Sequence, residues 1–308
     1  MVALEDRKLG RVDSCLRGGA SVPGLLRCGG VAELDRAQTV PELLLGPAPT
    51  GSTEGEGSGG GGGGGLGRGW DFVVVNDFSQ QACWPEERAA SEAALERELA
   101  PLLARGCGSA GGLGSGHGGG NGGATVALYA TPAYRRPVKG TEGLGDWAAF
   151  AAAQNEGYAA FAAALERGLA AAAAAAGLTP RVRVVVASAN GAFAAVRAER
   201  PGLWHDLFAD DDFHPSPAGS YLAACVLHVA LFHRAPPGPP ARECAVEALA
   251  PVGGDGGAGA GDFEEAQALF AGARRPLGEE QPSTRLPTAA EMAYLRGVAS
   301  AALAPAGN

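Results

Sequence analysis

The chain has few aromatic residues and no cluster of basic ones. Aromatic side chains make up 6% of its 308 residues, and the formal net charge is −9. A protein surface that binds nucleic acid needs a stripe or patch of Lys and Arg, and the sequence contains none. We therefore expect neither nucleic acid nor an anionic membrane surface as a partner.

Long apolar runs are also lacking. A transmembrane helix needs about 20 consecutive apolar residues, whereas the alanine-rich stretch 148–176 is interrupted by five polar or charged residues. The first residues, MVALEDRKLGR, are charged where a secretory signal has its apolar core. The sequence predicts no membrane span and indicates no compartment beyond a default cytoplasmic one. It leaves the oligomeric state open.

Cysteine and histidine do not occur at the spacings of a metal site. The six cysteines are scattered without any CxxC pair, which excludes a disulfide framework or a zinc ribbon. No second histidine lies at ligand spacing from His214. The sequence therefore predicts no bound metal.

Glycine, in contrast, is abundant. The chain has 50 glycines, and many of them fall in low-complexity runs that add length without adding core. We interpret 1–308 as a single domain, with glycine-rich insertions at 51–65, 106–123 and 253–261.

Apolar, β-branched runs alternate with helical patterns along the rest of the chain. This alternation predicts a parallel sheet with helices on both faces. The expected strands are 70–75, 125–130 and 181–187, with a shorter one at 11–16. The expected helices are 85–103, 147–176, 217–232 and 287–303, with a helix tail at 1–10. Residues 31–50 are expected as loop or irregular helix, and a loop with a short helix is expected between 187 and 207.

Polar features follow several of these strands. They are the Gly18-Gly19 turn, Asn76, Thr131 and the pair formed by Asp211 and His214. Parallel strands end at one edge of a sheet, and ligands bind beyond those ends. We therefore expect the functional site at this edge.

The stretch LFADDDFHPSPAGSY at 207–221 carries the strongest chemical signal. Asp211-x-x-His214 places a carboxylate within reach of an imidazole, and such a pair can serve as the base and its orienting group in a hydrolase. The competing interpretation of His214 is a capping or core histidine beside a proline turn. Asp210 and Asp212 are interpreted as solvated loop charges.

These residues resemble the SGNH (GDSL-type) hydrolase superfamily. The stretch from 207 to 228 is similar to the Asp-x-x-His block, WDFVVVNDFSQ to the asparagine block, and RVDSCLRGGAS, more weakly, to the glycine block. The resemblance covers most of residues 10–233. It implies a three-layer α/β/α sandwich with a mainly parallel, flavodoxin-like sheet.

The resemblance also implies roles for individual residues. His214 would be the general base and Asp211 its orienting group, while Asn76 and the backbone of Gly18 or Gly19 would hold the oxyanion. The substrate would be a carboxylic ester of a carbohydrate or lipid, and the chemistry requires no cofactor.

Three further residues are candidates for the substrate cleft. Asp77, Tyr134 and Arg135 follow two of the predicted strands at the same edge, where Tyr134 and Arg135 could contact an acidic or sugar-like substrate. A solvated loop is the competing interpretation.

The nucleophile is the departure from the family pattern. The family's serine follows a strand before the glycine block, and this chain begins inside what resembles the next helix, so we expect the serine block to be missing. Ser14 is a weak substitute, because it lacks a preceding apolar strand. The alternative function is a non-catalytic binding module that retains the cleft.

Overall fold

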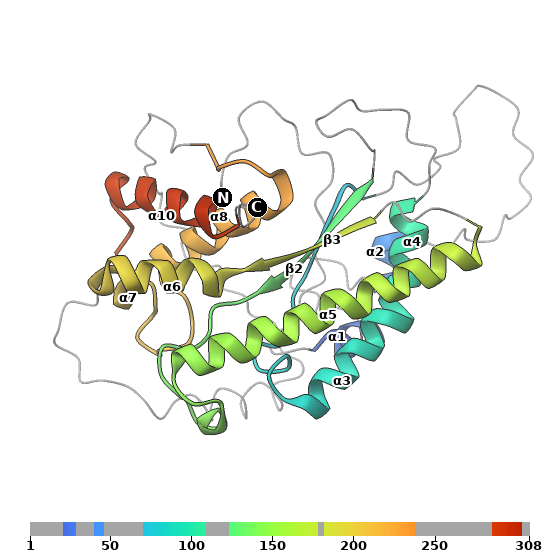
Figure 1. Ribbon diagram of the computed structural model, residues 1–308, viewed down its shortest axis with the longest axis horizontal. Coiled ribbons are helices and arrows are strands. Elements are labelled where there is room, and N and C mark those ends of the chain that lie inside the picture. The colour runs from blue at the N-terminus through green and yellow to red at the C-terminus, as the bar shows by residue number, and fades with distance from the viewer. Residues whose placement is uncertain are drawn as a thin grey trace, which may run out of the picture.

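The computed structural model describes residues 21–28, 40–45, 70–108, 123–177, 182–237 and 285–303. Helices surround a small sheet in this part of the chain (Figure 1). The elements expected at 1–10 and 11–16, and most of the three glycine-rich insertions, lie outside the described residues. Two short helices come first, α1 (Val22–Cys28) and α2 (Val40–Leu45), the second within the stretch expected as loop or irregular helix.

Three parallel strands form the described sheet, as the sequence predicts. They are β1 (Phe72–Val75), β2 (Ala124–Ala130) and β3 (Val182–Ser188), in the order β1-β2-β3. The register pairs Val74 with Ala127 and Ala127 with Val185. The described part of the chain is thus an α/β protein with a parallel sheet.

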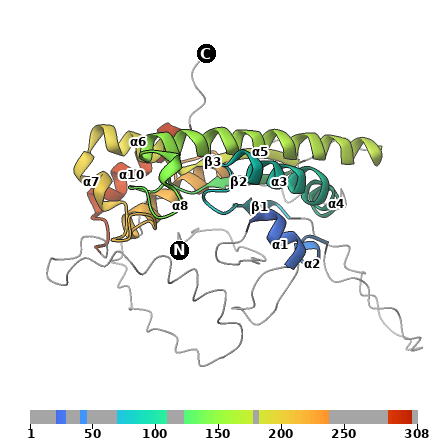
Figure 2. The same cartoon turned by 90° about the horizontal axis from the view of Figure 1, so that it is seen from below.

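Both faces of β2 are buried, because its side chains alternate between two hydrophobic clusters. Val126 and Leu128 pack among residues of α3 (Pro85–Ala94), α4 (Ala100–Gly108) and α5 (Trp147–Ala175). On the other face, Ala127 packs with residues of α6 (Ala189–Glu199), α8 (Pro217–Phe232) and α10 (Ala289–Ala302). Figure 2 shows α5 and α8 on opposite sides of the strands.

The helix expected at 85–103 is longer and less regular than predicted. It consists of α3 (Pro85–Ala94), a π-helical turn η1 (Leu95–Leu99) and α4 (Ala100–Gly108). In the π turn, the N–H of Ala100 donates to the carbonyl of Leu95, and the next residue, Pro101, has no N–H to donate. The helix also takes in 106–108, the first residues assigned to the second insertion.

The long helix α5 (Trp147–Ala175) covers one face of the sheet and matches the predicted range. Its first turn is capped by Asp146, which accepts a hydrogen bond from Ala149 N–H at 3.0 Å. Two glycines allow η1 and the loop before α3 to approach it closely. A Cβ on Gly157 would lie 2.1 Å from the carbonyl oxygen of Ala82, and one on Gly168 would lie 2.3 Å from that of Glu96.

The second half of the chain supplies the helices of the other face. A loop was expected after the third strand, but α6 (Ala189–Glu199) follows β3 directly, and α7 (Pro201–Asp206) follows α6. The predicted helices α8 (Pro217–Phe232) and α10 (Ala289–Ala302) are present. Thr288 and Glu291 form a capping box at the start of α10.

β1 is less buried than a continuous apolar strand predicts. Phe72 is 39% exposed and Val74 is 48% exposed. Within the described sheet, β1 pairs only with β2, and α8 contacts β2 and β3. One face of β1 therefore has little cover, apart from the ring of Phe232 at 5.0 Å from that of Phe72.

None of the helices in the described ranges is both long enough and apolar enough to cross a membrane.

The close packing of α5 can be tested with two glycine substitutions. Gly168→Ala should lower the free energy of unfolding by about 1–3 kcal/mol, because its Cβ would overlap the backbone of η1. The Cβ added by Gly297→Ala in α10 would meet no atom within 4 Å. This substitution should raise the free energy of unfolding by up to about 1 kcal/mol. Urea denaturation followed by tryptophan fluorescence measures both, and an equal effect of the two substitutions would contradict the packing.

Candidate functional site

Asp211 and His214 are in direct contact. The carboxylate oxygen Oδ2 of Asp211 lies 2.6 Å from Nδ1 of His214. The imidazole side chain is 65% exposed and the carboxylate side chain 37% exposed. A carboxylate at this distance favours the tautomer with the proton on Nδ1, which leaves Nε2 as a hydrogen-bond acceptor. Within the described ranges, Asp211 is the only hydrogen-bond partner of the ring.

The other oxygen of Asp211 is held by the backbone. Oδ1 accepts hydrogen bonds from the N–H of Phe213 at 3.1 Å and of His214 at 2.9 Å. Partial burial alone would raise the pKa of this carboxyl, but these N–H groups and the His214 ring bring the pKa below its ordinary value of 3.8. Asp211 is therefore a carboxylate at neutral pH.

The loop that carries the pair closes on itself. Phe208 and Pro215 form an isolated antiparallel bridge, and the N–H of Ala209 donates to the carbonyl of His214 at 2.8 Å. The loop connects α7 to α8 and so places His214 just before the start of α8.

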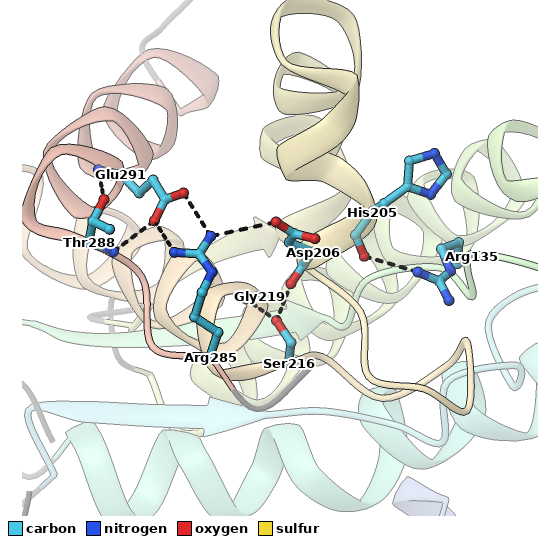
Figure 3. Close-up of polar contacts among 8 residues, drawn as sticks. All are labelled: Arg135, His205, Asp206, Ser216, Gly219, Arg285, Thr288 and Glu291. Atoms are coloured by element: carbon cyan, nitrogen blue, oxygen red, sulfur yellow. Dashed lines mark hydrogen bonds and ion pairs between the residues drawn. The ribbon is translucent and has the colours of Figure 1, made fainter. Parts of the chain in front are cut away.

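Ser216 fastens the end of this loop to α7 (Figure 3). Its hydroxyl donates to the carbonyl of Asp206 and accepts from the N–H of Gly219 at 3.2 Å, so it caps α8. Gly219 has to be glycine, because a Cβ there would lie 2.0 Å from the carbonyl oxygen of Leu207. Nothing in the sequence marks Gly219 as a required glycine apart from its place in the first turn of α8.

Arg135, a predicted residue of the substrate cleft, binds the loop between α7 and α8. Its guanidinium forms a close ion pair with Asp212. It also donates to the carbonyl of His205 at 3.0 Å (Figure 3). Asp212, interpreted as a solvated charge, has a side chain that is only 21% exposed. The expectation for Asp212 was wrong, because two consecutive arginines follow the second predicted strand and both pair with this carboxylate, Arg135 closely and Arg136 at 4.0 Å.

Tyr134 lies in the hydrophobic core rather than at the surface. It is 5% exposed, and its ring packs edge-on against Phe150 and Phe213 at 5.0 and 5.5 Å. The hydroxyl accepts a hydrogen bond from Gln80 Nε2 at 3.4 Å. The ring centroid of Phe213 lies 3.9 Å from that of His214. A chain of contacts therefore runs from the loop after β1, through Tyr134 and Phe213, to His214.

Asn76 and Asp77 follow β1 but have different environments. Asn76 is exposed, as an oxyanion donor must be. Asp77 is 2% exposed, and its Oδ1 accepts hydrogen bonds from the N–H of Val22 and of Phe78, both at 2.9 Å. Burial raises the pKa of Asp77, and the hydrogen bonds from the backbone N–H groups of Val22 and Phe78 only partly offset this. The carboxylate of Asp77 therefore fastens α1 inside the fold, and its burial does not favour contact with a substrate.

A buried pair of amides joins the loops at the ends of the strands. Gln154 Nε2 donates to the carbonyl of Ser79 at 2.7 Å, and Asn190 Nδ2 donates to Gln154 Oε1 at 2.9 Å. Asn190 Oδ1 accepts from the N–H of Ala133 at 2.8 Å. Sequence reasoning missed both side chains, although Gln154 interrupts an otherwise apolar helix face.

The other predicted site residues, Ser14, Gly18 and Gly19, lie outside the described residues. Within the described ranges, no three His, Cys, Asp or Glu side chains gather into a group that could hold a metal ion. A hollow of about 260 Å³ lies between α5 and the first residues of β3. Because β3 is parallel to its neighbours, this is the edge opposite the candidate site.

Comparison with protein-family models, with curated proteins and with solved structures finds no match for this chain.

The hydrogen bonds of Asp211 predict its titration. Its carboxyl should titrate below 3.8, so its contribution to stability is present above the unfolded-state pKa and is lost as the pH falls through the folded-state pKa. His214→Ala removes the ring hydrogen bond and should raise the pKa of Asp211. Carboxyl-detected NMR titration measures this. His205→Ala is the control, and an unchanged pKa in His214→Ala would refute the contact.

The burial of Asp77 gives a second prediction. Asp77→Ala leaves the buried N–H of Val22 without its acceptor and should cost about 1–3 kcal/mol of unfolding free energy at pH 7. Asp77→Asn keeps an oxygen for Val22 and relieves the desolvated charge, so its stability should equal or exceed the wild type. Because the folded-state pKa is raised, the wild type should also lose stability relative to Asp77→Asn as pH rises. Urea denaturation across pH 3–8 measures both effects, and equal losses in the two variants would contradict this role.

Proposed function

We propose that this protein is an SGNH-type hydrolase that acts on carboxylic esters of a carbohydrate or lipid. The observation that carries the proposal is the 2.6 Å contact between Asp211 and an imidazole that is itself 65% exposed. A histidine with a structural role is usually buried and bonded on both nitrogens. Here one nitrogen is held by a carboxylate, and within the described ranges no protein group hydrogen-bonds the other.

The arrangement of the fold supports the same family. The described sheet is parallel, and its two faces are covered by different sets of helices. Extended by further strands, this arrangement becomes the three-layer α/β/α sandwich of the SGNH hydrolases, which we propose as the fold of the complete domain.

The proposed reaction is acyl transfer through a serine. The serine oxygen attacks the ester carbonyl while Nε2 of His214 takes its proton, and Asp211 stabilises the imidazolium that forms. The amide of Asn76 and a backbone N–H of Gly18 or Gly19 stabilise the oxyanion. His214 then protonates the leaving alcohol, and water releases the acid from the acyl-enzyme by the same steps.

The nucleophile distinguishes this proposal from its alternative. A serine upstream of the glycine block fits the family pattern, and Ser14 is the weaker candidate. The absence of a hydroxyl bonded to His214 among the described residues favours one other function, a non-catalytic module that binds the ester without cleaving it.

Hydrolysis of p-nitrophenyl acetate tests the proposal, with protein expressed from its complete reading frame. His214→Ala should lower kcat/KM by roughly 10²- to 10⁴-fold, because the general base is lost. His205→Ala is the matched control: His205 is also an exposed histidine, but only its backbone carbonyl binds the site, so activity should stay within about twofold.

Labelling with a fluorophosphonate, followed by peptide mapping, identifies the nucleophile in the same samples. Modification of a serine in the wild type that is lost in His214→Ala supports the hydrolase. If the wild type is neither labelled nor active, the binding module is the better description. A loss of less than tenfold in His214→Ala would rule out His214 as the base.

A further inference from the structure

We propose that Arg135 is a positioning residue for His214, and that its ion pair with Asp212 holds the Asp211–His214 pair in its working geometry. The inference rests on the proposed function for its catalytic consequence. Its structural content, that Arg135 sets the orientation of the imidazole, can be tested without any activity.

Arg135 makes three polar contacts with α7 and with the loop that follows it. Its backbone N–H donates to the carbonyl of Asp212 at 2.7 Å, its guanidinium pairs with the Asp212 carboxylate, and Nη1 donates to the carbonyl of His205 at 3.0 Å. The guanidinium also lies over the ring of Phe208, 5.8 Å from its centroid. One side chain from the loop after β2 therefore connects the end of α7 to Asp212, in the loop between α7 and α8 that carries His214.

The backbone of Asp212 has an unusual conformation. Its φ of 67° lies in the left-handed region, which a residue with a side chain adopts at a cost in free energy. The N–H of Asp212 donates to the carbonyl of Ala209 at 3.1 Å, which closes a tight turn. The ion pair with Arg135 anchors this turn to the loop after β2 and so holds the neighbouring Asp211 toward His214.

Little else holds the imidazole. The His214 side chain is 65% exposed. Among the described residues its ring neighbour is Phe213, which packs on Tyr134, the residue beside Arg135. Because packing does not fix the ring, its position depends on the shape of the loop. Residues 134 and 135 hold that loop from one side, and Ser216 holds its end.

The tautomer of His214 reports on this positioning. With the Asp211 contact intact, the neutral ring carries its proton on Nδ1, whereas a free imidazole in water favours the proton on Nε2. Long-range proton–nitrogen NMR correlations on the ¹⁵N-labelled full chain distinguish the two. We expect Nδ1–H in the wild type and a shift toward Nε2–H in Arg135→Met.

Three variants separate positioning from general destabilisation. Arg88→Met removes a half-buried arginine with its own ion pair to Glu156 at 3.2 Å, and it should leave the tautomer unchanged. Asp212→Gly removes the carboxylate and also relieves the positive φ, so it should stay folded and still shift the tautomer. Arg135→Lys keeps the charge without the forked donor geometry, and we expect partial rescue.

Activity gives the second readout. In Arg135→Met and Asp212→Gly, kcat for p-nitrophenyl acetate should fall roughly 10- to 100-fold while KM changes by less than about twofold, because the base is misplaced and the binding surface is kept. Tautomer shifts in both variants without any wild-type esterase activity would support the positioning role and refute the hydrolase. A folded Arg135→Met that retains Nδ1–H, or a wild type with Nε2–H, would overturn the positioning role itself.

Discussion

The candidate site depends on one buried contact between two amides. Gln154 on α5 and Asn190 on α6 are 0% and 1% exposed, and they hydrogen-bond each other at 2.9 Å. Buried amides without partners are costly, so each outer atom takes a backbone group, the carbonyl of Ser79 and the N–H of Ala133. These groups belong to the loops that follow β1 and β2. The amide pair thus fixes both loops against the helix that starts at the end of β3.

The position of His214 follows from this constraint. Once the N–H of Ala133 is bound, the next two residues, Tyr134 and Arg135, are directed toward the loop between α7 and α8. Tyr134 packs on Phe213, and Arg135 donates to the carbonyl of His205 in the last turn of α7, where a cation is favoured. A loop that is distant in sequence is therefore held beside the ends of the strands.

Periodic and local features of the sequence predicted most of the described fold. The strands at 124–130 and 182–188, the helix at 147–175 and the Asp211–His214 contact all come from apolar runs, helix caps and a three-residue spacing, which are local properties. The partner of Asp212 could not be predicted, because Arg135 and Asp212 are 77 residues apart and no local pattern reports a pairing at that separation. The exposure of β1 was missed for a similar reason, since burial of a strand depends on which helices reach it.

Two adjacent aspartates show how the backbone assigns different roles to identical side chains. Asp211 and Asp212 have the same chemistry, and a regular strand would direct them to opposite faces without selecting a partner for either. The left-handed φ of Asp212 instead produces a tight turn, in which Asp211 bends back to its own loop and His214 while Asp212 points out to Arg135. Asp211 is therefore left to contact the imidazole of His214, because the guanidinium of Arg135 is already paired with Asp212.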